Sequence, residues 1–232
     1  VPQIIEECGE AGIDSAIIIS AGFKEVGSEG ARLEREGVEK ARQYGIRLIG
    51  PNCLGVIVPS IGLNASFAAG MPKAGNVAVL SQSGALATAV LDWAFDQGMG
   101  FSRFVSFGNA ADVELNELIE ALGEDEETSV VLAYMEGVQD GEEFMRVAEK
   151  VGRKKPLVIM KSGATESGAR AVSSHTGSLA GSAQAYRAAF RQTGVVQADS
   201  VQDLFDSAVA FSTLPLPQGR NVALITNAGG PG

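Results

Sequence analysis

Short apolar runs alternate with amphipathic segments along most of the chain. The runs are rich in aliphatic and β-branched residues and predict strands at Ser15–Ser20, Arg47–Ile49, Val77–Ser81, Arg103–Ser106, Val130–Tyr134, Leu157–Lys161 and Val222–Thr226. The other segments carry apolar residues at helical spacing and predict helices at Gln3–Ala11, Ser28–Tyr44, Ala85–Gln97, Val113–Leu122, Gly141–Val151, Ala183–Thr193 and Val201–Leu214. This alternation predicts βαβ units, and therefore an α/β fold with a parallel, doubly wound sheet.

Two breaks in the pattern divide the chain into three predicted parts. Residues 1–72 form a partial α/β unit that ends in an irregular stretch, and residues 73–214 contain enough elements for a flavodoxin-like sheet. Residues 215–232 begin as a proline-rich linker and continue into Asn221–Gly229, which repeats Asn76–Gly84 with four of nine positions identical. Either all first strands of α/β domains look alike, or a second, related domain begins here and the chain is a fragment.

Composition and charge exclude some classes of function. The chain has 232 residues, 45% of them hydrophobic, which is enough for substantial cores. A net charge of −10 argues against nucleic acid as a partner, although backbone N–H groups can still bind a phosphorylated ligand. No apolar run approaches the ~20 residues of a membrane span, and the start does not resemble a signal peptide. We therefore expect a cytoplasmic protein without a membrane partner, and we expect the acidic stretch at residues 123–127 to be a solvated turn.

The residue types that bind metals are sparse. Cys8 and Cys53 are the two cysteines, and they show neither CxxC spacing nor a surrounding histidine cluster. His175 is the single histidine. We therefore expect no metal site and no disulfide framework.

His175 stands near the end of a long segment, residues 162–182, which is rich in glycine and serine and lies between a predicted strand and a predicted helix. Long loops inside compact α/β domains are usually functional or disordered. A lone histidine is more often a structural or surface residue. Here the glycine-rich setting favours a functional one, because it suits movement and close backbone approach.

Two further elements could bind or orient a phosphoryl group. Ser83, Gly84 and Ala85 follow a strand and open a helix, where free N–H groups and the helix dipole favour an anion. Gly84 would allow an anion to approach closely, and it would allow a turn conformation that a Cβ would hinder. Ser83 could equally be the N-cap of the helix without binding a ligand. Glu136 follows a buried strand, where ligands bind in open α/β sheets. It could orient an imidazole or simply face solvent.

Together these motifs identify a family. Gly50–Gly55, Gly75–Leu86, Gly108–Asp112, Tyr134–Val138 and Ser173–Ser182 resemble motifs of the ADP-forming (NDP-forming) acyl-CoA synthetases, and more distantly of the α subunit of succinyl-CoA synthetase. The resemblance implies that residues 1–72 are the C-terminal half of a CoA-binding Rossmann-type domain. It implies that residues 73–214 are the first ligase domain, and that residues 215–232 lead into a second one.

The same resemblance implies the roles of individual residues. His175 would be phosphorylated and Glu136 would steady it. The phosphate would bind at the starts of two helices, formed by Ser83, Gly84 and Ala85 and by Ala228, Gly229 and Gly230. CoA and the acyl group would contact Ser20, Ala21, Gly22, Pro51, Asn52 and Cys53.

In this family, acyl-CoA, phosphate and ADP are converted to carboxylic acid, CoA and ATP through an acyl phosphate and a phosphohistidine. CoA or acyl-CoA and phosphate would bind this chain. ATP or ADP with Mg would bind an ATP-grasp domain or subunit, for which no counterpart is visible here, in a homo- or hetero-oligomer. The chain alone is expected to be inactive in the complete reaction.

Two other functions remain open. Some lysine acetyltransferases carry a related domain that senses acyl-CoA and typically lacks the phosphorylated histidine. The presence of both His175 and Glu136 favours the enzyme. A plain flavodoxin-like nucleotide-binding domain is the third possibility, and it leaves the segment around His175 unexplained.

Overall fold

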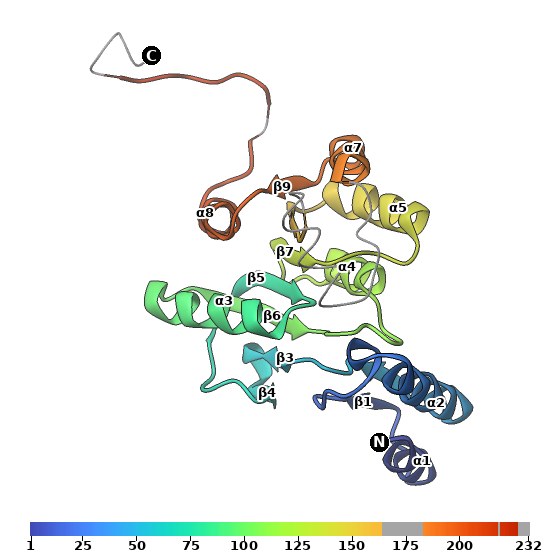
Figure 1. Ribbon diagram of the computed structural model, residues 1–232. Helices are drawn as coiled ribbons and strands as arrows, with labels where there is room; N and C mark the ends of the chain where they lie inside the picture. Colours follow the sequence, from blue (N-terminus) through green and yellow to red (C-terminus); the bar gives the residue numbers. More distant parts are fainter. Residues whose placement is uncertain (164–182, 218, 227–232) are drawn as a thin grey trace.

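The computed structural model describes residues 1–163, 183–217 and 219–226, and two sheets organise it (Figure 1). In the smaller sheet, β1 (Ser15–Ile17) and β2 (Arg47–Ile49) pair in parallel. Helices α1 (Pro2–Glu10) and α2 (Ser28–Tyr44) pack beside them, and the apolar side chains of these elements form a small separate core. We call residues 1–54 the N-terminal lobe.

The larger sheet, called here the main sheet, has seven strands in the order β4-β3-β6-β5-β7-β8-β9. Its strands are β3 (Gly55–Val58), β4 (Leu63–Ser66), β5 (Lys73–Ser81), β6 (Gly100–Ser106), β7 (Val130–Met135), β8 (Leu157–Lys161) and β9 (Val196–Ala198). All pairs from β6 to β9 are parallel, whereas β3 runs antiparallel to both of its neighbours. The parallel part has the flavodoxin-like order, so the α/β prediction is confirmed.

Helices cover both faces of the main sheet, which explains why its central strands are almost uniformly apolar. On β5, Ala78 and Leu80 point into the core under α4 and α5, whereas Val77 and Val79 point into the core under α3 and α8. The covering helices are α3 (Gly84–Gln97), α4 (Leu115–Glu124), α5 (Gly141–Gly152), α7 (Ala183–Thr193) and α8 (Val201–Thr213). The chain changes face between β5 and β7, which makes the carboxyl ends of these strands the switch point where ligands bind.

The stretch before residue 72 is more regular than predicted. Strands β3 and β4 form an antiparallel hairpin, joined by a short 3-10 helix (Pro59–Ile61) and by Gly62 in the left-handed conformation. The hairpin pairs with β6, so the main sheet includes residues on both sides of the boundary predicted at residue 72. Because both strands are short, their alternation of apolar and polar positions is too brief to predict them from the sequence.

Other predictions of strands also need correction. Val222–Thr226 forms no strand in the structure, and Figure 1 shows this segment extending away from the main sheet. Val222 is 90% exposed and Ile225 is 95% exposed, whereas the similar sequence of β5 pairs with a strand on each side and is covered by helices on both faces. Strand β1 is shorter than predicted, and β9 was not predicted. A strand is defined by its neighbours, and local sequence does not supply them.

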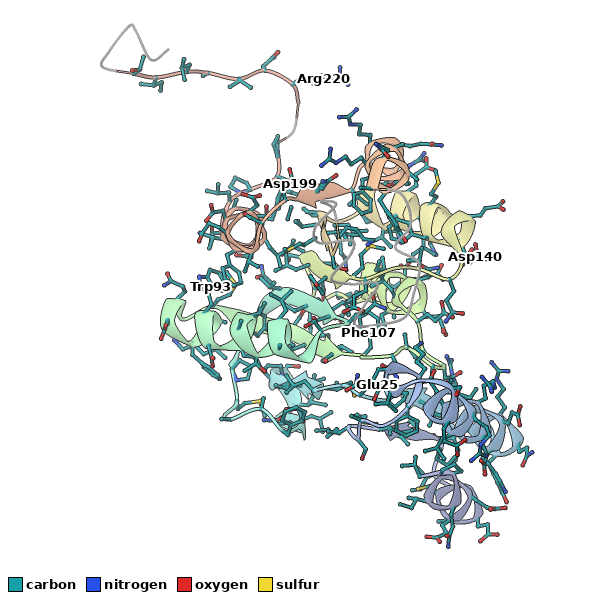
Figure 2. All side chains as sticks on the ribbon, viewed as in Figure 1. Glu25, Trp93, Phe107, Asp140, Asp199 and Arg220 are labelled. Carbon is teal, nitrogen blue, oxygen red and sulfur yellow. The ribbon has the colours of Figure 1, made fainter. Side chains whose placement is uncertain are left out.

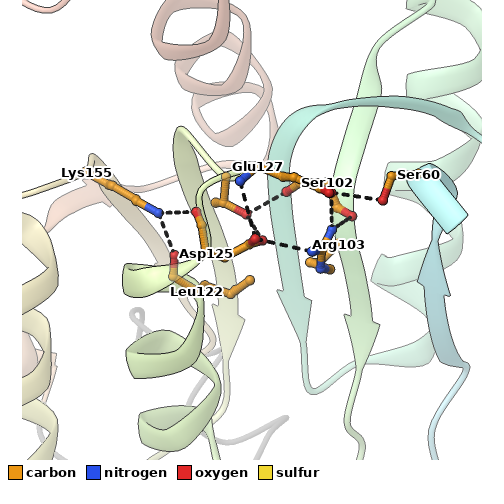
Figure 3. Close-up of polar contacts among 8 residues, drawn as sticks. Ser60, Ser102, Arg103, Leu122, Asp125, Glu127 and Lys155 are labelled. Atoms are coloured by element: carbon orange, nitrogen blue, oxygen red, sulfur yellow. Dashed lines mark hydrogen bonds and ion pairs between the residues drawn. The ribbon is translucent and has the colours of Figure 1, made fainter.

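The acidic stretch at residues 123–127 is not simply solvated (Figure 3). Asp125 accepts a 2.7 Å hydrogen bond from Thr128 and pairs with Arg103 at 3.2 Å. Glu127 pairs with the same guanidinium at 2.6 Å, and Lys155 donates to the carbonyl of Asp125. This network lies near the amino ends of β6, β7 and β8, away from the switch point, and ties their loops together.

Candidate functional site

A cavity of about 670 Å³ lies at the switch point and extends to the N-terminal lobe. This volume is in the range of small-molecule and cofactor sites. The cavity is lined by residues from distant parts of the chain, among them Ala21, Asn52, Cys53, Phe67, Ser83, Gly84, Ala85, Asn109, Asn116, Glu136, Val138 and Tyr186. It therefore joins the predicted CoA region, the start of α3 and Glu136 in one space.

The start of α3 opens into this cavity. Ser83 is the N-cap, and its Oγ accepts a 3.2 Å hydrogen bond from the amide of Leu86. The capping role weighed for Ser83 is thus confirmed. Gly84 and Ala85 provide the first two amides of the helix, which have no acceptor within it. Those amides and the helix dipole form a surface suited to an anion.

The expectation that Gly84 is needed for an unusual backbone conformation is wrong. Its φ is outside the left-handed region, and a Cβ built on it would meet nothing within 4 Å. Gly84 lines the cavity, so its lack of a side chain matters only for a ligand that approaches it from within the cavity.

Glu136 is half-buried at the end of β7 and is held in place through its backbone. The side-chain oxygen of Gln82 accepts hydrogen bonds from the amides of Glu136 at 2.5 Å and Gly137 at 3.3 Å. The amide of Gln82 in turn donates to the carbonyl of Tyr134. Gln82 thus fastens the loop before α3 to the end of β7. Gln82 was not predicted as a site residue, although it directly precedes Ser83.

Tyr186 and Asn116 are further wall residues that the sequence analysis missed. The hydroxyl of Tyr186 accepts a 3.3 Å hydrogen bond from the amide of Val138. Asn116 is 7% exposed and donates to the carbonyl of Asp140 at 3.2 Å. Its Oδ1 has no partner among the described residues, so the wall of the cavity contains an unused acceptor.

Backbone contacts bring the N-terminal lobe against the main sheet. The carbonyl of Pro51 accepts a hydrogen bond from the amide of Asn109, and that of Gly50 accepts one from Ala111. Gly108 lies so close to this loop that a Cβ would fall 2.2 Å from the carbonyl oxygen of Asn52. Its φ of 51° also favours glycine. These contacts fix the side of the cavity nearest the N-terminal lobe.

The predicted CoA and acyl residues divide into two groups. Ala21, Asn52 and Cys53 line the cavity. The others do not line it but shape its loops: the carbonyl of Ser20 accepts from Asn52, the amide of Gly22 donates to Glu25, and Pro51 is the backbone acceptor described above. Burial raises the pKa of the Cys53 thiol to about 11, and its Sγ donates to the carbonyl of Ile18. Cys53 is therefore a neutral wall residue.

A polar cluster that the sequence did not reveal borders the cavity at Glu25, which Figure 2 shows between α2 and the main sheet. The side-chain amide of Asn109 donates to Glu25 at 2.7 Å and to Glu34 at 2.8 Å. Lys24 donates to the carbonyl of Asn109 and lies 3.6 Å from Glu34. Burial would raise the pKa of Glu25, but hydrogen bonds from Asn109, Gly22 and Phe23 outweigh it and lower that pKa.

Several predictions fall outside the described residues: His175, and the second helix start at Ala228, Gly229 and Gly230. Within residues 1–163, 183–217 and 219–226, no three His, Cys, Asp or Glu side chains come together in a way that could hold a metal ion. Within the same ranges no helix is both long and apolar enough to cross a membrane.

Two family descriptions match the chain. Residues 74–211 match the succinyl-CoA ligase like flavodoxin domain, and residues 1–59 match a CoA binding domain. The first match covers the strands and helices that surround the switch point.

Individual relatives agree with these matches. The chain is 55% identical over its whole length to acetate–CoA ligase [ADP-forming] I of Archaeoglobus fulgidus, of which it covers 34%. It is 49% identical to the α subunit of acetate–CoA ligase [ADP-forming] I of Pyrococcus furiosus, of which it covers 50%. A solved acetyl-coenzyme A synthetase 1 of Ca. Korarchaeum cryptofilum, in complex with phosphate and ADP, superposes with a TM-score of 0.90 at 43% identity. That match covers 94% of this chain and 47% of the other. The chain thus spans a third to a half of the length of these relatives.

Proposed function

Because this chain belongs to the family of succinyl-CoA-ligase-like flavodoxin domains, with ADP-forming acetate–CoA ligases among its relatives, we propose that it is the CoA-ligase part of an ADP-forming acyl-CoA synthetase. The complete enzyme would interconvert acyl-CoA, phosphate and ADP with carboxylic acid, CoA and ATP. The two relatives named above are acetate–CoA ligases, so acetate is the first acid to test as substrate.

The proposed reaction has three balanced steps. Phosphate attacks the thioester carbonyl, the C–S bond breaks, and acyl phosphate and CoA thiolate form. A nitrogen of His175 then attacks phosphorus, and the carboxylate leaves. Finally ADP attacks the phosphohistidine, which gives ATP and restores the imidazole. Neutral imidazole suits the middle step because it is nucleophilic near pH 7 and its phosphoramidate transfers onward readily.

The cavity at the switch point is the observation that carries this proposal. The start of α3, Glu136 and the loops of the N-terminal lobe all line it, which supports a site for a phosphoryl group between them. The amides of Gly84 and Ala85 would hold the phosphoryl group, and Glu136 would orient and charge the imidazole. Asn52 and Cys53 would contact the CoA thioester end. Fixed dipoles and positioning supply most of the stabilisation in phosphoryl transfer.

The nucleotide step needs a partner. On the family resemblance, we assign ADP and Mg to an ATP-grasp domain or subunit. His175 would carry the phosphoryl group between the two sites. The helix start at Ala228, Gly229 and Gly230 would complete the phosphate site from a second ligase domain. The complete enzyme would be a homo- or hetero-oligomer in the cytoplasm.

The phosphohistidine can be tested directly. Full-length protein incubated with radiolabelled ATP and Mg should acquire an acid-labile, base-stable label. His175→Ala should abolish that label, whereas Ser174→Ala and Thr176→Ala should retain it. Label that persists in this region of His175→Ala would remove His175 from the mechanism.

The role of Glu136 needs a second variant. Glu136→Gln keeps the size of the side chain and should preserve the fold. It should slow labelling by ~10²–10⁴-fold, as expected for a positioned acid or base. Labelling at the wild-type rate would make Glu136 a structural residue.

A further inference from the structure

Asn109 is a half-buried residue on the loop after β6, and it lines the cavity where the main sheet meets the N-terminal lobe. Both polar atoms of its side chain form hydrogen bonds with that lobe. Its Nδ2 donates to the carboxylates of Glu25 at 2.7 Å and Glu34 at 2.8 Å. Its Oδ1 accepts a 3.3 Å hydrogen bond from the side chain of Asn52. One side chain of the main-sheet loop thus connects three residues of the N-terminal lobe that lie far apart in the sequence.

The two carboxylates explain why an amide is suited to this position. An ionised carboxylate only accepts hydrogen bonds, and an amide NH₂ group has two donors, one for each of them. The side chain of Glu34 is only 10% exposed, so water replaces a lost donor poorly. Replacement of the amide would therefore loosen the contact between Asn109 and the N-terminal lobe.

The backbone at Asn109 is held to the same lobe. Its amide donates to the carbonyl of Pro51 at 2.9 Å, and its carbonyl accepts a 2.5 Å hydrogen bond from Nζ of Lys24. Asn52 and Ala110 line the cavity from the two sides of this contact, and both have left-handed backbones, with φ of 57° and 52°. Such conformations are uncommon for residues other than glycine and persist where the surrounding structure fixes them. The contact therefore has one defined geometry.

The two halves of the acyl-CoA reaction proposed above meet across this contact. Asn52 and Cys53, on the N-terminal lobe, would contact the thioester end of CoA, whereas the start of α3, on the main sheet, would hold the phosphate. Attack requires the reacting atoms to lie within ~3–3.5 Å of each other, and a displacement of ~1 Å can cost ~10²-fold in rate. Phosphoryl transfer between His175 and the nucleotide does not involve the N-terminal lobe in the proposed mechanism.

We infer that Asn109 is a positioning residue: its side-chain amide fixes the loop of Asn52 and Cys53 relative to the start of α3, and so aligns the acyl-CoA thioester with the phosphate. The inference rests on the function proposed above and adds a residue that serves the acyl-CoA half of the reaction. Loss of the amide should slow the formation of acyl phosphate and leave the exchange with ATP intact.

Two labelling reactions of the full-length protein separate these halves. One starts from radiolabelled ATP and Mg, and the other from acetyl-CoA and radiolabelled phosphate, which must pass through acyl phosphate. In Asn109→Ala the maximal rate of labelling from acetyl-CoA and phosphate should fall by ~10²-fold. Labelling from ATP should keep the wild-type rate.

A second variant shows that the contact itself is responsible. Asn109→Asp keeps the size of the side chain and its Oδ1, but it places a third carboxylate beside Glu25 and Glu34, so labelling from acetyl-CoA should fall at least as far. Combining it with Glu25→Gln restores an amide–carboxylate pair in the reverse direction. The double variant should recover part of the lost rate, and no recovery would contradict a role for this contact.

Asn76→Ala is the matched control. Asn76 is also half-buried, and its side-chain amide donates a 3.3 Å hydrogen bond to the carbonyl of Ser212, which is distant in the chain, but Asn76 is not among the residues that line the cavity. Both labelling rates should be unchanged in this variant. If folded Asn109→Ala loses both labelling rates equally, or loses neither, Asn109 does not position the thioester and the inference fails. If the wild-type protein is labelled from neither source, the proposed function itself fails.

Discussion

The backbone amide of Glu136 donates a 2.5 Å hydrogen bond to the side-chain oxygen of Gln82, and the neighbouring amide of Gly137 shares the same acceptor. The carboxylate at the end of β7 is thereby fixed to the loop that begins α3. Each of these two elements presents a different group to the cavity, an acid and a row of amides. Gln82 sets the spacing between them.

Gln82→Met should therefore impair the site more than the fold. Met has a similar length but no amide oxygen, so two amides lose their acceptor at a cost of ~1–3 kcal/mol. We expect the free energy of unfolding, measured in urea, to fall by that amount, and labelling of the folded variant to fall by at least ~10-fold. Gln202→Met on α8 is the control, since Gln202 is exposed and donates a hydrogen bond to Asp206 on the same helix. Equal labelling in both variants would contradict the role of Gln82.

Gly84→Val tests whether an anion approaches the start of α3. A Cβ there meets nothing within 4 Å, so the free energy of unfolding should change by less than ~1 kcal/mol. Labelling should nevertheless fall severely, because the new side chain enters the cavity. Gly141→Val is a close control, since Gly141 opens α5 and also has open space around it. If Gly84→Val is labelled normally, the phosphoryl group does not bind at this helix.

Ser83→Ala separates capping from ligand binding at the same helix. It removes the acceptor for the amide of Leu86 and should cost ~0.5–2 kcal/mol of stability, typical of a lost N-cap. Because the phosphate would be held by backbone amides, labelling should stay within a few-fold of wild type under conditions where the variant is folded. A large loss of labelling with unchanged stability would assign the hydroxyl to the ligand instead.

Glu25 should make stability depend on pH in the acidic range. Its pKa in the folded protein lies below the ordinary value of 4.5, because hydrogen bonds from Asn109 and two amides outweigh the effect of burial. Its stabilising contribution is therefore complete above pH 4.5 and is lost as the pH falls through the lower, folded value. Urea midpoints from pH 3 to 6 should fall less steeply in Glu25→Gln than in wild type. Identical slopes would show that Glu25 does not contribute.

Cys53 should react slowly with thiol reagents. With a pKa of about 11, only a small fraction is thiolate at pH 8. We expect alkylation by iodoacetamide to be ~100-fold slower than for an ordinary thiol, and Cys8, which is partly exposed, to be modified first. Mass spectrometry of timed samples measures both rates, and both cysteines should react readily in urea. Rapid modification of Cys53 in the folded protein would show that the wall around it opens.

Site residues that follow the ends of strands could be predicted from the sequence, whereas site residues that depend on tertiary packing could not. Glu136 and the start of α3 were predictable because the carboxyl ends of parallel strands meet at one edge of the sheet. Gln82 and Tyr186 were not, since each contacts a residue that is distant in the chain. The role of His175 stays a prediction because it lies outside the described residues.

The dependence on contacts between distant parts of the chain also explains the errors in the predicted strands. The sequence of Val222–Thr226 resembles β5, but only β5 has a strand on each side in the structure. The hairpin of β3 and β4 was not predicted because its pattern of apolar and polar residues is weak. Its pairing with β6 nevertheless makes it part of the main sheet. Burial of an apolar run is a property of the surrounding fold.

The loop around Gly50 and Pro51 and the loop around Gly108 are joined by backbone hydrogen bonds and by a contact that leaves no room for a Cβ. This contact between the two loops limits where segments of related proteins can be exchanged to make a chimera. A chimera with its crossover at residue 72 would take the two loops from different parents and bring together backbones that did not evolve as a pair. Crossovers before residue 50 or after residue 111 keep this contact intact, and recombinants of that kind should fold more often.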